Sequence, residues 1–281
     1  MIYISTGGYS EFTASETIEK LSQHNIHSFE LSGGKYSPNL SQELIKISNK
    51  NNLVVHNYFP PPEIPFVINL ASLDEKVFKL SFDHIKNSIK LASLIKSPYY
   101  SFHAGFLVDL KVNELGKSVL KRDLFDKNKA LSKFISAMNF LSEFAEEYNV
   151  KLIIENNVLT KGNLLKFGEN PMLMVDLEGT EEIFQKLNRN IGLLIDVAHL
   201  KVSALTLNFD PGEYMKNFNS FTLAYHLSDN DGKKDSNESI SNDSWFWPYL
   251  RRDLDYYSLE IYNQEPWEIL SQLKLVKDFI N

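Results

Sequence analysis

Gly192-Leu-Leu-Ile-Asp196-Val-Ala-His199 is an apolar run that ends in a carboxylate, with a histidine three positions later. An uninterrupted apolar run of this length predicts a strand buried on both faces, as in parallel sheets. An ionised Asp at the end of a buried strand is costly unless a charge or hydrogen bonds compensate it. A cation bound by Asp196 and His199 would provide that compensation. The stretch therefore predicts a parallel strand with a metal site at its end.

The same pattern recurs along the chain, because five other short β-type runs also end in a side chain that can bind a metal. A further strand carries Glu30 near its end, and the first predicted strand follows the amino terminus. The five runs are Leu-Val-Val-His56, Tyr-Ser-Phe-His103, Leu-Ile-Ile-Glu155, Leu-Ala-Tyr-His226 and Tyr-Ser-Leu-Glu260. The other predicted strands cover 2–6 and 26–31.

These eight strands alternate with helical patterns. Thr13-Ala-Ser-Glu16 fits a capping box, and Asp210-Pro211 is typical of a helix start. A helix is expected over 181–187, whereas 158–178 has no clear pattern and 172–175 fits either a short strand or a buried loop. Strands and helices in this order predict the α/β class and a (β/α)8 TIM barrel, with 1–281 as a single domain.

Composition excludes several classes. The 281 residues contain no cysteine, so a metal would need nitrogen and oxygen ligands, and disulfides are excluded. No apolar run approaches the roughly 20 residues that cross a bilayer, and the amino terminus lacks a signal-peptide pattern, so the expected location is cytoplasmic without membrane attachment. The net charge of −7 disfavours a large nucleic-acid surface.

The active sites of such barrels lie at the carboxyl ends of the strands, where the polar side chains of this chain gather. Imidazole and carboxylate together suit Zn, Mn, Fe or Co. Each residue alone could be an ordinary hydrogen-bonded buried group. Several unpaired carboxylates facing one cavity would repel one another, however, and a divalent cation removes that repulsion. The candidates are Glu30, His56, His103, Glu155, Asp196, His199, His226, Asp229 and Glu260.

On these residues the chain resembles the xylose isomerase-like TIM barrel superfamily, which contains sugar isomerases and epimerases and the endonuclease IV family. Phe29-Glu30-Leu-Ser-Gly33-Gly34 is similar to sugar phosphate isomerase/epimerase proteins. The motifs that resemble endonuclease IV are the stretch 66–72, His103-Ala-Gly105 and the Asp196-x-x-His199 pair. The resemblance covers nearly the whole chain and implies the same barrel.

The resemblance also implies roles for individual residues. Glu155 and Glu260 would be the catalytic acid/base pair. His56 and His103 would either bind a second ion or hydrogen-bond the sugar; the second ion is favoured because these two histidines and Glu155 make a sensible bridging set. The reaction implied is isomerisation or epimerisation of a sugar by proton transfer next to a carbonyl, through an enediolate that the metal stabilises. The first divalent ion would be held by Glu155, Asp196, His226 and Glu260. The substrate-binding residues would be Glu30, Asn57, His199 and Asp229.

Three other readings stay open. An abasic-site endonuclease would need a third metal. In that family the third metal is bound by a histidine after strand six, matched here by His199, and by an Asp-x-His pair. The corresponding pair here is Asp235-Ser-Asn237, and Asn is a weak ligand. The segment 192–214 also resembles metal-dependent barrel oxidases, and a non-catalytic sugar-binding barrel is a further alternative. The expected partner is a small-molecule sugar or sugar phosphate rather than nucleic acid, and a homodimer is compatible with the resemblance.

Overall fold

The computed structural model describes residues 1–115, 117–262 and 264–281. Eight parallel strands close into a barrel in the order in which they occur in the chain, each hydrogen-bonded to the next and β8 to β1. The predicted (β/α)8 barrel is confirmed. The strands are β1 (Ile2–Ser5), β2 (Ser28–Leu31), β3 (Asn52–His56), β4 (Tyr99–His103), β5 (Lys151–Glu155), β6 (Gly192–Asp196), β7 (Thr222–Leu227) and β8 (Tyr256–Leu259).

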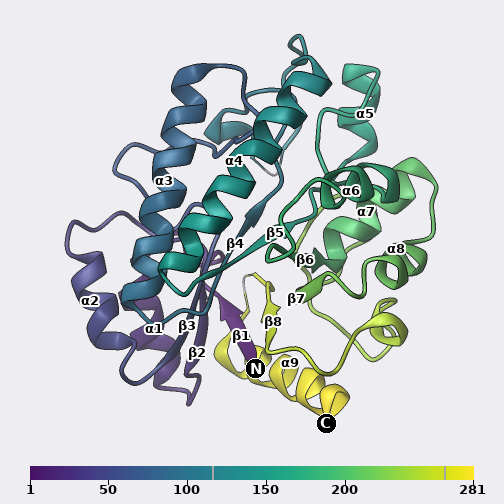
Figure 1. Ribbon diagram of the computed structural model, residues 1–281. Helices are drawn as coiled ribbons and strands as arrows, with labels where there is room; N and C mark the ends of the chain where they lie inside the picture. The colour runs from purple at the N-terminus through teal and green to yellow at the C-terminus, as the bar shows by residue number, and fades with distance from the viewer. Residues whose placement is uncertain (116, 263) are drawn as a thin grey trace.

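Helices surround the barrel, and α9 crosses its lower end in the view of Figure 1, near the amino terminus. No helix among the described residues is both long and apolar enough to cross a membrane. The helices are α1 (Ala14–Ser22), α2 (Leu40–Ile47), α3 (Glu75–Leu94), α4 (Lys127–Glu147), α5 (Lys161–Phe167), α6 (Leu177–Phe184), α7 (Val197–Leu207), α8 (Pro211–Asn217) and α9 (Pro266–Ile280), with the short 3-10 helices η1 (Val112–Glu114) and η2 (Trp247–Tyr249).

The strands position the site through their two-residue side-chain period. In β5, Ile154 belongs to the main core under the helices, whereas Ile153 belongs to a separate apolar cluster. Two residues after Ile153 comes Glu155, on the same face of the strand. The same step of two separates Leu194 from Asp196. The interior of the barrel is therefore apolar at one level and polar at the next, towards the carboxyl ends; its apolar cluster contains Tyr3, Val54, Ile153, Leu194, Ala224 and Tyr256.

Most helices begin at a residue whose side chain caps the helix N-terminus. Thr13 and Glu16 form the predicted capping box of α1, and Asp210 caps α8 with Pro211 at its first turn. The helix expected over 181–187 instead begins at Leu177, because the Asp176 side chain caps it by accepting from the Gly179 N–H at 2.8 Å. The stretch 172–175 is a buried loop with one isolated bridge, between Met172 and Phe106.

Candidate metal centre

Four side chains from four strand ends meet at the carboxyl mouth of the barrel. One ligand atom from each lies within 4.8 Å of the others. His226 is central, because its Nδ1 lies 3.0 Å from Glu260 Oε2, 3.2 Å from Glu155 Oε1 and 3.7 Å from Asp196 Oδ2. The group consists of Glu155, Asp196, His226 and Glu260, which are the residues that the sequence suggested for one ion.

Glu155 connects this group to a second one. Its Oε1 faces His226, whereas its Oε2 lies 3.4 Å from His56 Nε2 and 3.1 Å from His103 Nδ1. His56, His103 and Glu155 therefore form a separate three-ligand group. A carboxylate with one oxygen on each side has the arrangement that lets one side chain serve two neighbouring cations.

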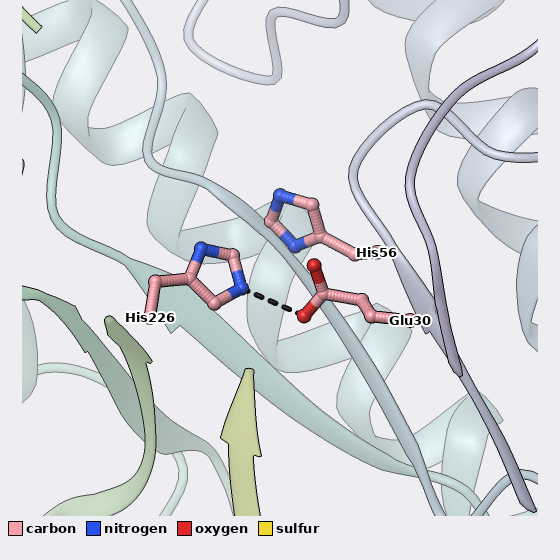
Figure 2. Close-up of side chains that lie close together, drawn as sticks. All are labelled: Glu30, His56 and His226. Atoms are coloured by element: carbon pink, nitrogen blue, oxygen red, sulfur yellow. Dashed lines mark hydrogen bonds and ion pairs between the residues drawn. The ribbon is translucent and has the colours of Figure 1, made fainter. Parts of the chain in front are cut away.

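Glu30 lies deeper in the barrel and makes a third group with His56 and His226, which Figure 2 shows pointing toward one another. Its Oε2 accepts hydrogen bonds from His226 Nε2 at 2.7 Å and from the Tyr256 hydroxyl at 2.5 Å. Burial opposes ionisation of Glu30, but His226 and His56 overcome it and lower its pKa to about 2. Glu30 contacts Nε2 of His226, whereas the other three carboxylates face Nδ1, so Glu30 lies behind His226.

This carboxylate fixes the tautomers of the histidines around it. An ionised carboxylate only accepts hydrogen bonds, so His226 must carry its proton on Nε2, which leaves Nδ1 free to face the three other carboxylates. The Tyr256 hydroxyl donates its only proton to Glu30. Its oxygen therefore accepts from Ser101 Oγ at 3.2 Å. Ser101 Oγ in turn accepts from His56 Nδ1 at 2.9 Å, which leaves His56 Nε2 free to face Glu155. Both free nitrogens point into the ligand groups.

The charges of the cluster are unbalanced without a cation. Burial raises the pKa of Glu155 to about 7. Burial also disfavours charged imidazole, and it lowers the pKa of His56 to about 4. For His226 the neighbouring carboxylates of Glu30, Glu155 and Glu260 outweigh burial and raise the pKa well above its usual value. Without a cation, a second proton on His226 therefore supplies the positive charge between these carboxylates. A bound cation would take the place of that proton.

Unpaired buried atoms show that the residues fit a metal ion. Buried polar atoms in proteins nearly always have hydrogen-bond partners. Within the described residues, atoms of the two ligand groups stand out among the buried side-chain atoms that lack such a partner, and a cation would satisfy lone pairs of this kind. They are Glu155 Oε1 and Oε2, Asp196 Oδ2, His103 Nδ1 and His226 Nδ1; Glu30 Oε1 is a further one, deeper in the barrel.

His199 lies beside these groups but belongs to none of them. Asp196 positions it, since Oδ1 of Asp196 caps α7 by accepting from the His199 N–H at 2.7 Å. The ring donates from Nδ1 to the Asn156 carbonyl at 3.0 Å, and its Nε2 lies 3.3 Å from Asp235 Oδ2. Asp235 of the suggested third-metal pair is thus near His199. Asn237, its other member, lies in the left-handed region with φ of 47°.

Two further suggested substrate residues, Asp229 and Asn57, also lie outside the ligand groups. Both carboxylate oxygens of Asp229 have partners: Lys201 Nζ lies 2.6 Å from Oδ1, and the Ser244 hydroxyl donates to Oδ2 at 2.8 Å. Asp229 thus secures the loop after β7. Asn57 lines a small cavity next to His103.

Sequence reasoning missed the hydrogen-bond partners of the ligands. Tyr262 donates to Glu260 Oε1 at 2.7 Å, while Tyr256 and Ser101 complete the chain between Glu30 and His56. Tyr256 and Ser101 were detectable in principle, because each lies a multiple of two positions from a candidate ligand on its own strand. Nothing local distinguishes Tyr262.

The xylose isomerase-like TIM barrel family model matches residues 18–268. The chain belongs to this family. Among curated proteins, a probable endonuclease 4 of Sulfurihydrogenibium is 25% identical over 192 residues, which are 62% of this chain and 58% of that protein. The chain thus spans little more than half of that relative's length.

Solved structures of sugar epimerases share the fold over nearly the whole chain. A D-tagatose 3-epimerase-like protein superposes with a TM-score of 0.74 at 22% identity, covering 99% of this chain and 96% of its own. D-Psicose 3-epimerase of Clostridium cellulolyticum superposes with a TM-score of 0.68 at 11% identity, covering 100% and 99%. At these identities the likeness establishes the fold.

Proposed function

We propose that this protein is a divalent-metal-dependent isomerase or epimerase of a sugar or sugar phosphate. The observation that carries the proposal is the convergence of Glu155, Asp196, His226 and Glu260 on one point, with buried unpaired atoms facing it. The structural likeness to sugar epimerases supports the choice of reaction class.

Glu155 and Glu260 would move the proton. A general acid or base must lie within reach of the proton that it moves, and the Glu155 and Glu260 carboxylates both face the centre, 3.2 Å and 3.0 Å from His226 Nδ1. The Tyr262 hydroxyl donates to Oε1 of Glu260 and leaves Oε2, which lies 3.0 Å from His226 Nδ1, toward the centre. One glutamate would remove the proton from the carbon beside the carbonyl, and the other would return a proton.

The ion would be Zn, Mn, Fe or Co, held by Glu155, Asp196, His226 and Glu260, and a second could lie between His56, His103 and Glu155. When bound, a divalent ion polarises a carbonyl and stabilises negative charge on its oxygen. Asp196 and His226 would hold the ion without taking part in proton transfer.

Deuterium incorporation tests the proposal. Metal-loaded protein is incubated in deuterated water with a panel of ketoses and aldoses, and NMR follows the proton on the carbon beside the carbonyl. We expect exchange with at least one sugar. Glu155→Gln and Glu260→Gln should each slow exchange by about 100-fold or more, because general acid–base catalysis contributes on that order. Folded, metal-loaded protein that exchanges no proton across the panel would contradict the assignment.

The similarity to a probable endonuclease 4 favours an abasic-site endonuclease as the second candidate. That activity would use His199 and Asp235, which are 3.3 Å apart. Incubation with a duplex containing one abasic site separates the two candidates. We expect an intact strand; cleavage that disappears in Asp196→Asn would favour the endonuclease.

A further inference from the structure

A cavity of about 40 Å³ adjoins the metal centre and is lined by both polar and apolar side chains. His103 belongs both to the cavity lining and to the ligand group with His56 and Glu155. With 26% of its side chain exposed, His103 is the most open member of the three ligand groups, compared with 0% for Glu155. The cavity therefore lies where a substrate held at the centre would extend outward.

Most of the lining is hydrocarbon. Asn57, Tyr58 and His103 supply its side-chain amide, hydroxyl and imidazole groups, and neither Lys nor Arg is among the lining residues that the structure describes. A space of this volume holds a methyl-sized group or a water molecule. The remaining lining residues are Phe66, Val67, Ile68, Phe106 and Leu115.

The walls come from the β3–α3 and β4–α4 loops, and Asn69 joins the two. Its Oδ1 accepts from the backbone N–H of Phe106 at 2.9 Å and of Ala71 at 3.1 Å. Its Nδ2 donates to the Phe106 carbonyl at 3.0 Å and to Asp109 Oδ1 at 2.9 Å. Asn69 is buried, with 1% of its surface exposed. A buried amide with satisfied hydrogen bonds therefore fixes the two loops that line the cavity to each other.

From this cavity we infer the substrate class: the sugar is an unphosphorylated deoxy sugar whose terminal methyl group occupies the cavity, while its carbonyl end lies at the metal centre. This inference rests on the proposed function. A hydroxyl turned toward the walls of Phe66, Val67 and Ile68 would lose its water partners without a replacement, and burying a polar group without a hydrogen bond is costly. A methyl group there gains from leaving water. A phosphate would meet no cationic partner among the lining residues.

Matched pairs of ketohexoses test the inference, and each pair consists of a 6-deoxy sugar and its 6-hydroxy parent. Examples are L-fuculose with L-tagatose and L-rhamnulose with L-fructose. The panel also contains pairs of the D series and a 6-phosphate. Deuterium exchange gives kcat/KM for each. We expect a preference of about 10- to 100-fold for the deoxy member of a processed pair, since apolar pockets reject an added hydroxyl by about that factor. The 6-phosphate should not react.

Saturation-transfer NMR supplies a readout independent of turnover. The methyl protons of a bound deoxy sugar should receive the strongest saturation from the protein. Val67→Thr replaces a wall methyl by a hydroxyl of nearly equal volume, so the deoxy preference should fall at least threefold. Val112→Thr makes the same change at a residue that is 43% exposed and absent from the lining, and should leave the preference unchanged.

The outcomes distinguish this inference from the proposed function. Exchange with equal kcat/KM for both members of each pair, or with a preference for the hydroxylated member, would overturn the deoxy assignment and leave the isomerase assignment standing. Binding with strong methyl saturation but without exchange for any sugar would support the cavity assignment and overturn the reaction. Weak methyl saturation, or no binding of any deoxy sugar, would overturn the cavity assignment whether or not Val67→Thr folds.

Discussion

Glu30 shows how a residue's role depends on its depth in the barrel. The sequence suggested that it contacts the substrate, but its Oε2 accepts from both His226 and Tyr256, so it can orient a ligand instead. Partners that orient metal-binding histidines typically contribute 10- to 100-fold to metal affinity. The sequence indicated that Glu30 lies near the end of a strand. It did not indicate the contact with Tyr256, which is 226 positions away.

Glu30→Gln should therefore weaken metal binding by about 10- to 100-fold, since a neutral amide holds the His226 imidazole less strongly. Competition with a chromogenic chelator measures the dissociation constant. Glu114→Gln is the matched control, because it removes another buried carboxylate that lies outside the ligand groups. Unchanged affinity together with a raised KM for the sugar would return Glu30 to the substrate role.

At the scale of elements, the β4–α4 connection is held by Glu114 in η1. Its carboxylate pairs with the Arg122 guanidinium and accepts from the backbone N–H groups of Lys111 at 2.8 Å and Leu120 at 2.9 Å. Burial opposes ionisation, but these partners overcome it and lower the pKa of Glu114 to about 2. Sequence spacing alone does not reveal this pairing, because it depends on the path of the loop.

The sign of the pH dependence follows from that pKa. A carboxyl whose pKa falls on folding stabilises the protein above its unfolded value of 4.5, and this contribution disappears as the pH falls toward 2. Glu114→Gln should lower the free energy of unfolding by about 2 kcal/mol at pH 7, and the difference from wild type should shrink below pH 4.5. Urea titrations from pH 7 to 3 measure it. Glu11→Gln removes an exposed partner of Lys35 and should change little. A difference that is as large at pH 3 as at pH 7 would contradict this account.

At the scale of the whole molecule, the barrel and the meeting of the strand ends were predictable from sequence. The step of two from Ile153 to Glu155 and from Leu194 to Asp196 fixes which side chains face the interior, and closure of the barrel makes them neighbours. The position of Asp229 was not predictable, because nothing near it in sequence reveals that Lys201 lies 2.6 Å from its carboxylate. The cavity was equally hidden, since its walls come from two irregular loops.

Metal binding should stabilise the entire barrel, because the ligands come from strands on several sides of it. At 100 times the dissociation constant a ligand adds about 2.7 kcal/mol, which corresponds to a rise in Tm of about 5 °C for a chain of this size. Calorimetry of chelator-treated protein, before and after addition of Zn, Mn, Fe or Co, measures the rise. Asp196→Asn should abolish it. The absence of any rise with all four metals would argue against the centre.

The Tyr256 hydroxyl has a consequence that reaches beyond either ligand group. Through Glu30 it is linked to His226, and through Ser101 it is linked to His56, so one proton chain passes behind both candidate ion positions. Occupation of one position would polarise this relay and alter the basicity of the imidazole at the other. Tyr256→Phe would therefore weaken the coupling between the two positions and leave the shared Glu155 carboxylate as the remaining link.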